Sequence, residues 1–174
     1  MTVLEAITAW LCADFIAGTV HWWEDRYGDP SWPLLGKHII QPNIVHHRSP
    51  REFLQQGYWA RNWTTLVPAL AVAAVAAWLG YWFVATVAVC TSQANEVHAW
   101  AHQRCSRPIR GLQLLGILHS PEQHAAHHTQ PFDDAFCPMS DWTNWALTAI
   151  GFWRGAEQLV ACVGISVRLD RAEA

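Results

Sequence analysis

The sequence predicts an all-α integral membrane protein with about three to four transmembrane helices, interfacial helices and a histidine-rich metal site at one membrane face. Apolar residues make up 52% of the chain and charged residues only 14%, a balance typical of membrane proteins. Three apolar runs approach the ~20 residues that span a bilayer core. Most of the ten histidines come in close pairs or clusters, which is the pattern of a metal site.

The length and charge of the chain limit its class. A chain of 174 residues fits one domain, so residues 1–174 are expected to form a single membrane domain. A net charge of −3 and the lack of a basic stripe exclude a nucleic-acid partner. The five cysteines are widely spaced and form no CxxC pair. Neither a disulfide framework nor a thiolate zinc site is predicted, and any metal is expected to be held mainly by nitrogen.

The first apolar run predicts a span at about residues 3–23. It lacks a basic n-region, so we expect a retained helix rather than a signal peptide. Asp14 interrupts the run, and a costly carboxyl group within a span is a functional candidate unless it pairs with another helix or snorkels. His21 follows two turns later, and Asp25 lies one turn beyond, close enough to orient the His21 imidazole.

Residues 26–62 form a connector rich in Gly, Pro, Arg and Trp, with no long apolar run. It carries His38 and the adjacent pair His46 and His47. Neighbouring residues on a helix point about 100° apart, so the pair suits two metals better than chelation of one. Pro50 is expected to end the helix that holds them.

The most apolar part of the chain predicts a hairpin of two spans, at about 63–79 and 81–102, turning at Gly80. Tryptophans near the ends of these spans predict two aromatic belts. The second span ends in NEVHAWAH, where His98 and His102 stand at i and i+4, the spacing that two-histidine metal sites use. Asn95 lies one turn earlier and could position a ligand or water.

The last third of the chain is expected to lie at the membrane surface. Residues 111–120 are too few to span and predict an interfacial or re-entrant segment. The stretch QHAAHH then places three imidazoles on one face of a helical turn: His124, His127 and His128. Residues 142–167 mix large apolar side chains with Arg154 and Glu157, which predicts an interfacial helix.

The basic residues predict the orientation of the chain. With three spans, the connector and the C-terminal part lie on the same side of the membrane, and all eleven Lys and Arg residues fall on that side. The histidines lie on that side too, or in the helix turns that lead into it. The positive-inside rule makes that side cytoplasmic. We therefore expect an integral membrane protein whose metal site lies on the cytoplasmic side.

The number of candidate ligands favours two metals. A zinc ion needs three or four ligands, whereas the clusters supply eight: His21, His46, His47, His98, His102, His124, His127 and His128. A dinuclear site of neutral nitrogen ligands is suited to oxygen activation by non-haem iron. Asp25 would help to balance its positive charge.

Four stretches, in order, resemble the Kua/CarF-type lipid desaturase family, which includes plasmanylethanolamine and plant chloroplast palmitate desaturases. They are DFIAGTVHWWEDRYG (14–28), HHRSP (46–50), NEVHAWAH (95–102) and QHAAHHTQPFDDAFC (123–137). The resemblance implies a membrane enzyme with two iron ions that uses O2 and external electrons to remove two hydrogens from a lipid chain, and it implies the same eight ligands.

The chain departs from the family pattern at a few positions. Ser49 stands where the family tends to have Asp, and Glu96 where it tends to have Gln. His38 and His119 have no counterpart and are left out of the predicted site. These changes bear on substrate choice more than on metal binding.

Together these features predict a desaturase that introduces a double bond near a lipid head group, of the vinyl-ether or fatty-acyl type. An external electron donor, a cytochrome b5-like or ferredoxin-like protein, is expected, and the basic cluster Arg104, Arg107 and Arg110 is either its docking patch or a membrane anchor. A membrane lipid hydroxylase or a non-enzymatic metal- or haem-binding membrane protein remains an alternative. A zinc hydrolase is weaker, because eight ligands exceed its need and no HExxH is present.

Overall fold

The computed structural model describes residues 1–168, and in that part of the chain all regular structure is helical. The elements in chain order are α1 (Val3–Arg26), the π-helix η1 (Gly36–Ile40), α2 (Gln41–Arg48), the 3₁₀ helix η2 (Glu52–Gln55), α3 (Tyr58–Trp78), α4 (Trp82–Thr91), α5 (Ala94–Ala101), α6 (Arg107–Leu114), α7 (Pro121–His127), α8 (Asp141–Ala149) and α9 (Phe152–Cys162). The expected all-α fold is confirmed for these residues.

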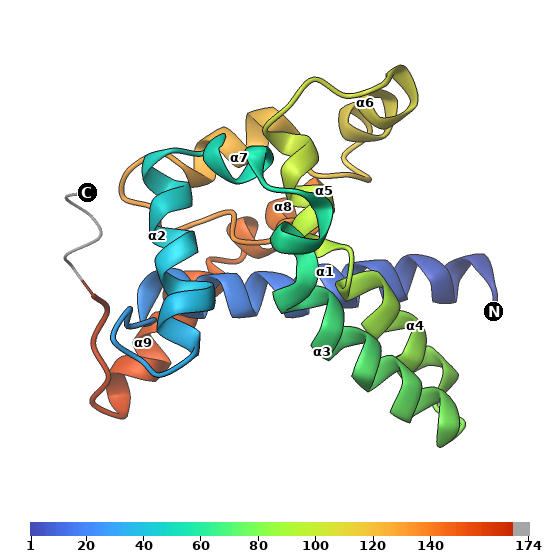
Figure 1. The fold of residues 1–174 in the computed structure, drawn as a ribbon, viewed down its shortest axis with the longest axis horizontal. Coiled ribbons are helices and arrows are strands. Elements are labelled where there is room, and N and C mark those ends of the chain that lie inside the picture. The colour runs from blue at the N-terminus through green and yellow to red at the C-terminus, as the bar shows by residue number, and fades with distance from the viewer. Residues whose placement is uncertain (169–174) are drawn as a thin grey trace.

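Helix α1 is the element against which the others are arranged. It begins in a capping box, because the Thr2 hydroxyl accepts from the Glu5 amide (3.2 Å) and the Glu5 carboxylate accepts from the Thr2 amide (2.7 Å). Figure 1 shows α1 crossing the molecule, with α2, α5 and α7 gathered on one side of it and the α3–α4 hairpin projecting away. Ala9 and Ala13, both fully buried, let α1 approach α4 and α5 closely.

The predicted span 81–102 is not one continuous helix. Helix α4 ends at Thr91 and α5 begins at Ala94. The Ser92 hydroxyl donates to the Val89 carbonyl (2.6 Å), and such a side-chain bond competes with the helical pattern and favours a bend. The bend turns α5, with its two histidines, toward α2 and α7.

The predicted interfacial helix 142–167 is likewise divided, into α8 and α9. The chain reverses at Gly151, whose φ of 64° lies in the left-handed region that glycine adopts without a steric penalty. Two shorter helices can therefore fold back beside α1, where Trp153 of α9 is buried against Trp22.

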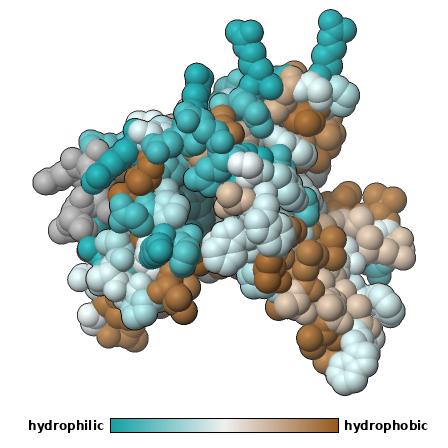
Figure 2. Space-filling model, viewed as in Figure 1, coloured by the Kyte–Doolittle hydropathy of each residue, from teal (hydrophilic) through white to brown (hydrophobic). Residues whose placement is uncertain are grey.

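Apolar side chains are exposed along the α3–α4 hairpin. Trp78 is 84% exposed and Trp82 is 69% exposed, and Val72, Val75 and Leu79 are also exposed. Figure 2 shows this hydrophobic surface at the lower right, whereas hydrophilic residues predominate on the opposite, upper left side, where α2 and α7 lie in Figure 1. Among the described residues, α1 is the one helix whose length and hydropathy suffice to cross a membrane, so the other two predicted spans stay a prediction.

Candidate metal centre

Five histidines converge from three elements into one group, here called the five-histidine group. His46 comes from α2, His98 and His102 from the end of α5, and His124 and His128 from the end of α7. Their ligand nitrogens all lie within 4.8 Å of one another. The Nε2 atom of His124 lies 2.6 Å from that of His102, 2.9 Å from that of His128 and 3.0 Å from that of His98. His46 is 3.2 Å from both His102 and His128.

Helix α7 owes its position to its first turn. Ser120 is the N-cap, and its hydroxyl accepts from the Gln123 amide at 3.2 Å. Pro121 follows at the first helical position, where its missing N–H costs no hydrogen bond. The short helix then presents His124 and His128, four residues apart, on the same face.

A second group, here called the aspartate group, consists of His21 and Asp25 from α1, His47 from α2 and His127 from α7. Asp25 is its centre: its Oδ1 is 3.1 Å from His47 Nε2, and its Oδ2 is 3.2 Å from His127 Nε2 and 3.4 Å from His21 Nε2. Asn43 also donates to Asp25 Oδ1, at 2.6 Å. Asp25 therefore stands among the candidate ligands, a more direct position than the supporting one that the sequence predicts.

The two groups adjoin each other. The ring centroids of His47 and His128 are 4.8 Å apart, and those of His21 and His98 are 5.7 Å apart. His46 and His47, adjacent in the sequence, belong to different groups. All eight histidines of the predicted site are thus brought together in one double cluster.

The spacing and the donor chemistry both fit two metal ions. When two ligand atoms each lie about 2.1 Å from a metal and subtend a right angle at it, they are about 3.0 Å apart. This distance matches the separations of 2.6–3.3 Å between Nε2 atoms in the five-histidine group. Protein hydrogen bonds do not explain so many imidazole nitrogens facing one another, because each neutral ring has one donor. The Nε2 atoms of His21 and His127 are buried and make no hydrogen bond. Imidazole and carboxylate are ligands suited to iron and zinc.

Backbone carbonyl groups orient the two buried rings of the aspartate group. His21 Nδ1 lies 3.0 Å from the Phe136 carbonyl oxygen, and His127 Nδ1 lies 2.9 Å from that of Asp134. A carbonyl only accepts, so both Nδ1 atoms donate and each neutral ring keeps its Nε2 lone pair for a ligand role.

Burial and neighbouring imidazoles favour the neutral form of three rings in the five-histidine group, those of His46, His124 and His128. Desolvation, reinforced by His127 and His47, lowers the pKa of His128 to about 2. The pKa of His46 is also lowered, by burial and by His102 and His128, and that of His124 lies well below its usual range because of burial and His98. Neutral imidazole is the form that binds a metal.

Aromatic rings close two sides of the double cluster. Phe53 of η2 packs against His46 with a centroid distance of 4.7 Å. Phe136, fully buried, packs against His127 at 5.1 Å. An open cavity of about 730 Å³ reaches the five-histidine group at His102, and its lining also includes Ser49, Pro50, Arg51, Glu52, Gln55, Ala101 and Pro121.

The loop before α8 approaches α1 at Gly18. A Cβ at this position would lie 2.5 Å from Cys137 Sγ and 2.9 Å from Cys137 Cα, so only glycine permits the contact. Asn144 holds Cys137 from the other side, donating to its carbonyl (2.8 Å) and accepting from its amide (3.0 Å). This close approach brings the Phe136 carbonyl to His21.

Two polar candidates from the sequence lie outside the double cluster. Asp14 is fully buried and accepts from the Met139 amide (2.7 Å) and from the Ser140 amide (3.0 Å) and hydroxyl (2.9 Å), so it ties α1 to the loop before α8. Asn95 donates to the Arg61 carbonyl at 3.0 Å, which connects α5 to α3.

The structure also shows the contacts of the residues at which the chain departs from the family pattern. Glu96 pairs with Arg61 at 2.7 Å and joins α5 to α3. Ser49 caps the end of α2 and lines the cavity. The His38 ring packs against Trp63 at 5.6 Å, away from the candidate ligands.

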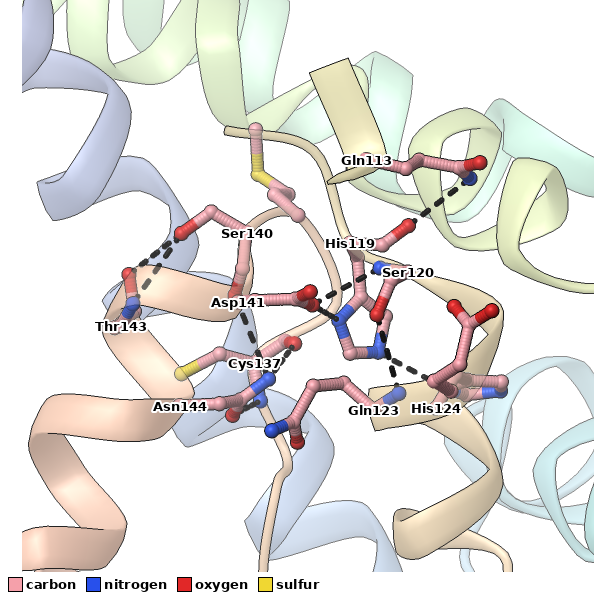
Figure 3. A network of polar contacts seen from close by, with 12 residues as sticks. Gln113, His119, Ser120, Gln123, His124, Cys137, Ser140, Asp141, Thr143 and Asn144 are labelled. Atoms are coloured by element: carbon pink, nitrogen blue, oxygen red, sulfur yellow. Dashed lines mark hydrogen bonds and ion pairs between the residues drawn. The ribbon is translucent and has the colours of Figure 1, made fainter. Parts of the chain in front are cut away.

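His119, which the sequence analysis leaves out of the predicted site, lies directly beside the five-histidine group. It is fully buried, its Nε2 lies 3.2 Å from His124 Nδ1, and its Nδ1 lies 3.0 Å from Asp141 Oδ1. Figure 3 shows this chain of contacts from α8 through His119 to His124. Burial opposes ionisation of Asp141, but hydrogen bonds from His119 and Ser120 outweigh it and hold the pKa of Asp141 below its usual range.

Comparison with known proteins identifies the family. A family model described as the lipid desaturase domain matches residues 10–170. Plasmanylethanolamine desaturase of Myxococcus xanthus is 30% identical, over 94% of this chain and 62% of its own length. Plasmanylethanolamine desaturase 1 of Mus musculus is 30% identical over 99% and 69%, and the chloroplastic fatty acid desaturase 4-like 2 of Arabidopsis thaliana is 31% identical over 95% and 61%.

The chain therefore spans less than two thirds of the length of the Myxococcus and Arabidopsis relatives. No solved structure matches it. The resemblance drawn from the four sequence motifs is confirmed by the match over residues 10–170, and the chain belongs to the lipid desaturase family.

Proposed function

We propose that this chain is an oxidoreductase, an O2-dependent, non-haem di-iron desaturase that introduces a double bond into a lipid chain near its head group. The observation that carries the proposal is the double cluster, with five candidate ligands in one group and four in the other. Family membership supports a lipid substrate, since the relatives are named as plasmanylethanolamine and fatty acid desaturases.

The residues divide between two ions. The five-histidine group would hold one iron, and the aspartate group would hold the other. When bound, the iron would supply the oxidation of an unactivated C–H bond by O2. Asp25 contributes the only carboxylate in either group and partly offsets the charge of the metals. The balanced reaction converts one saturated C–C bond, O2, two electrons and two protons into an alkene and two waters.

The surrounding residues prepare these ligands. The Phe136 and Asp134 carbonyl groups hold the rings of His21 and His127 in the tautomer that frees Nε2. Phe53 and Phe136 cover the rings from two sides and limit the access of water. The side open to a substrate is the cavity at His102.

We infer that the chain is an integral membrane protein with this site on the cytoplasmic side. The length and hydropathy of α1 support one span. The exposed apolar side chains of the α3–α4 hairpin would be costly in water and suit lipid. The turn at Gly80 carries no basic residue, whereas Arg48, Arg51 and Arg104 flank the histidines, in agreement with the positive-inside rule.

The position of the cavity supports reaction near the lipid head group. Its lining is polar where Arg51, Glu52 and Gln55 contribute, and none of its lining residues belongs to the apolar α3–α4 hairpin. A lipid whose head group occupies this polar mouth would present its first chain carbons to His102. A vinyl-ether or near-carboxyl double bond is therefore the expected product.

Electrons would come from an acidic carrier of the cytochrome b5 or ferredoxin type. Arg104 and Arg107 are exposed beside α5 and are the candidate docking residues. Arg110 is less available, because it pairs with Glu122 at 2.7 Å. Reversing the charge of both Arg104 and Arg107 should slow turnover with the natural donor but not with a small chemical reductant. If the charge-reversed variant turned over as fast as the unchanged protein with the natural donor, the docking role would be refuted, and membrane anchoring would be the role of these two residues.

Lipid analysis of an expressing host tests the function. The expected result is a new double bond next to an ether oxygen or near the acyl carboxyl carbon, which is absent when O2 is withheld and absent with His128→Ala. A hydroxylated lipid in its place would make the protein a hydroxylase. A double bond found only deep in the acyl chain would contradict the argument from the position of the cavity.

A further inference from the structure

A buried histidine and a buried aspartate lie behind one candidate ligand of the five-histidine group. His119 is fully buried and Asp141 is 2% exposed. His119 precedes α7, whereas Asp141 is the first residue of α8, so the fold and not the local sequence brings them together. In Figure 3 the two side chains point toward each other, and the far side of the His119 ring faces His124.

The contacts determine which atom donates and which accepts in each hydrogen bond between Asp141, His119 and His124. Asp141 Oδ1 accepts from the Ser120 amide at 2.9 Å and lies 3.0 Å from His119 Nδ1. His119 Nδ1 therefore donates to the carboxylate, and in the neutral ring Nε2 is left as an acceptor. The contact of 3.2 Å between His119 Nε2 and His124 Nδ1 then requires His124 Nδ1 to donate. His124 Nε2 consequently carries no proton and faces the five-histidine group with its lone pair.

The backbone of His119 is fixed as firmly as its ring. Its amide donates to the Met139 carbonyl at 2.8 Å, and its carbonyl accepts from Gln113 at 3.1 Å. The ring is fully buried and contacts a partner at each nitrogen, so its orientation, and through it that of His124, is set by the contact with Asp141.

We propose that His119 and Asp141 are positioning residues that hold the candidate metal ligand His124 in the tautomer and ring orientation needed for metal binding. This inference rests on the proposed function. The usual support of a metal-bound histidine is a carboxylate in direct contact with it, and here the His119 imidazole is inserted between the Asp141 carboxylate and the candidate ligand His124. Neither residue touches the substrate or the metals.

A series of substitutions at His119 separates this role from packing. In His119→Gln, the amide oxygen reaches the place of Nε2 and can still accept from His124. In His119→Asn, the shorter amide can donate to Asp141 but does not reach His124. His119→Leu fills the space without either contact. At Asp141, Asp141→Asn keeps an acceptor oxygen for Ser120 and His119, whereas Asp141→Ala removes it.

The measurement is the retention of iron by purified protein during dialysis against increasing concentrations of a chelator. Loss of a supporting partner weakens metal binding by about 10–100-fold. We expect His119→Leu, His119→Asn and Asp141→Ala to release one of two irons at a correspondingly lower chelator concentration. His119→Gln and Asp141→Asn should stay within about threefold of the unchanged protein, since the first keeps the acceptor for His124 Nδ1 and the second keeps the acceptor for His119 Nδ1.

Gln113→Met is the control for a purely structural effect. It removes the hydrogen bonds to the His119 and Trp100 carbonyl groups, at 3.1 and 3.3 Å, but leaves the imidazole contacts intact. It should lower thermal stability without changing iron retention. Retention by His119→Leu equal to that of the unchanged protein, or equal losses in the Gln and Leu variants, would overturn the positioning role. If the unchanged protein itself holds no metal, the proposed function fails and this inference fails with it.

Discussion

Gly18→Ala is predicted to disturb the metal centre through the loop that contacts α1. The new methyl group would lie 2.5 Å from Cys137 Sγ and 2.9 Å from Cys137 Cα. Ordinary carbon contacts are about 3.5–4.0 Å, so the backbone of Cys137 must move by about 0.6 Å or more. Asn144 holds that backbone by two hydrogen bonds and resists the movement.

The movement has a cost in stability and an effect on His21. Overpacking of a close contact costs about 1–3 kcal/mol. The Phe136 carbonyl is adjacent to Cys137 and lies 3.0 Å from His21 Nδ1. A shift of about 0.6 Å away from α1 would stretch this bond beyond hydrogen-bonding distance and cost about 1 kcal/mol more. For a chain of this size, the sum of about 2–4 kcal/mol lowers the melting temperature by roughly 4–16 °C.

The assay is thermal unfolding in detergent together with the metal content of the purified variant. Gly155→Ala is the matched control, because a Cβ at Gly155 of α9 meets no atom within 4 Å. Alanine is the better helix former, so the control should be as stable as the unchanged protein or slightly more so. The double variant Gly18→Ala/Cys137→Ala should recover only part of the loss, since the contact with Cα remains. If Gly18→Ala matches Gly155→Ala in stability and metal content, the reasoning is refuted.

Three further predictions follow from the same contacts. Asp14→Ala leaves the donors of Met139 and Ser140 unpaired, at about 1–3 kcal/mol for each buried group, and should destabilise the fold while the folded fraction keeps its metals; loss of metal without loss of stability would contradict this role. His47→Ala should reduce the metal content from two ions to one, and His102→Ala should remove the other ion, so a variant that loses both or neither would argue against two groups. Removing the metals with a chelator should lower the melting temperature, because metal binding contributes to folding; an unchanged melting temperature would count against a built site.

The candidate ligands could be predicted from the sequence because their spacing is local. His98 and His102 share a helix face by their four-residue separation, and so do His124 and His128. The same argument places Asp25 near His21. The spacing does not predict the division into two groups. His46 and His47 enter different groups only once α2 is packed against α1 and α7.

The features that depend on tertiary contacts were not predictable in this way. His119 lies before the first turn of α7, and its partner Asp141 is 22 residues away in the sequence. A carboxyl group in an apolar helix is costly, which makes Asp14 a functional candidate, but its partners are the Met139 amide and the Ser140 amide and hydroxyl, more than a hundred residues later. The bend between α4 and α5 depends on the side-chain hydrogen bond of Ser92, which hydropathy does not register.

The metal content of the purified protein tests the central claim most directly. Elemental analysis against protein concentration should give two irons per chain, one for the five-histidine group and one for the aspartate group. One zinc per chain, with no iron after expression in iron-rich medium, would contradict the di-iron centre and the desaturase function built on it.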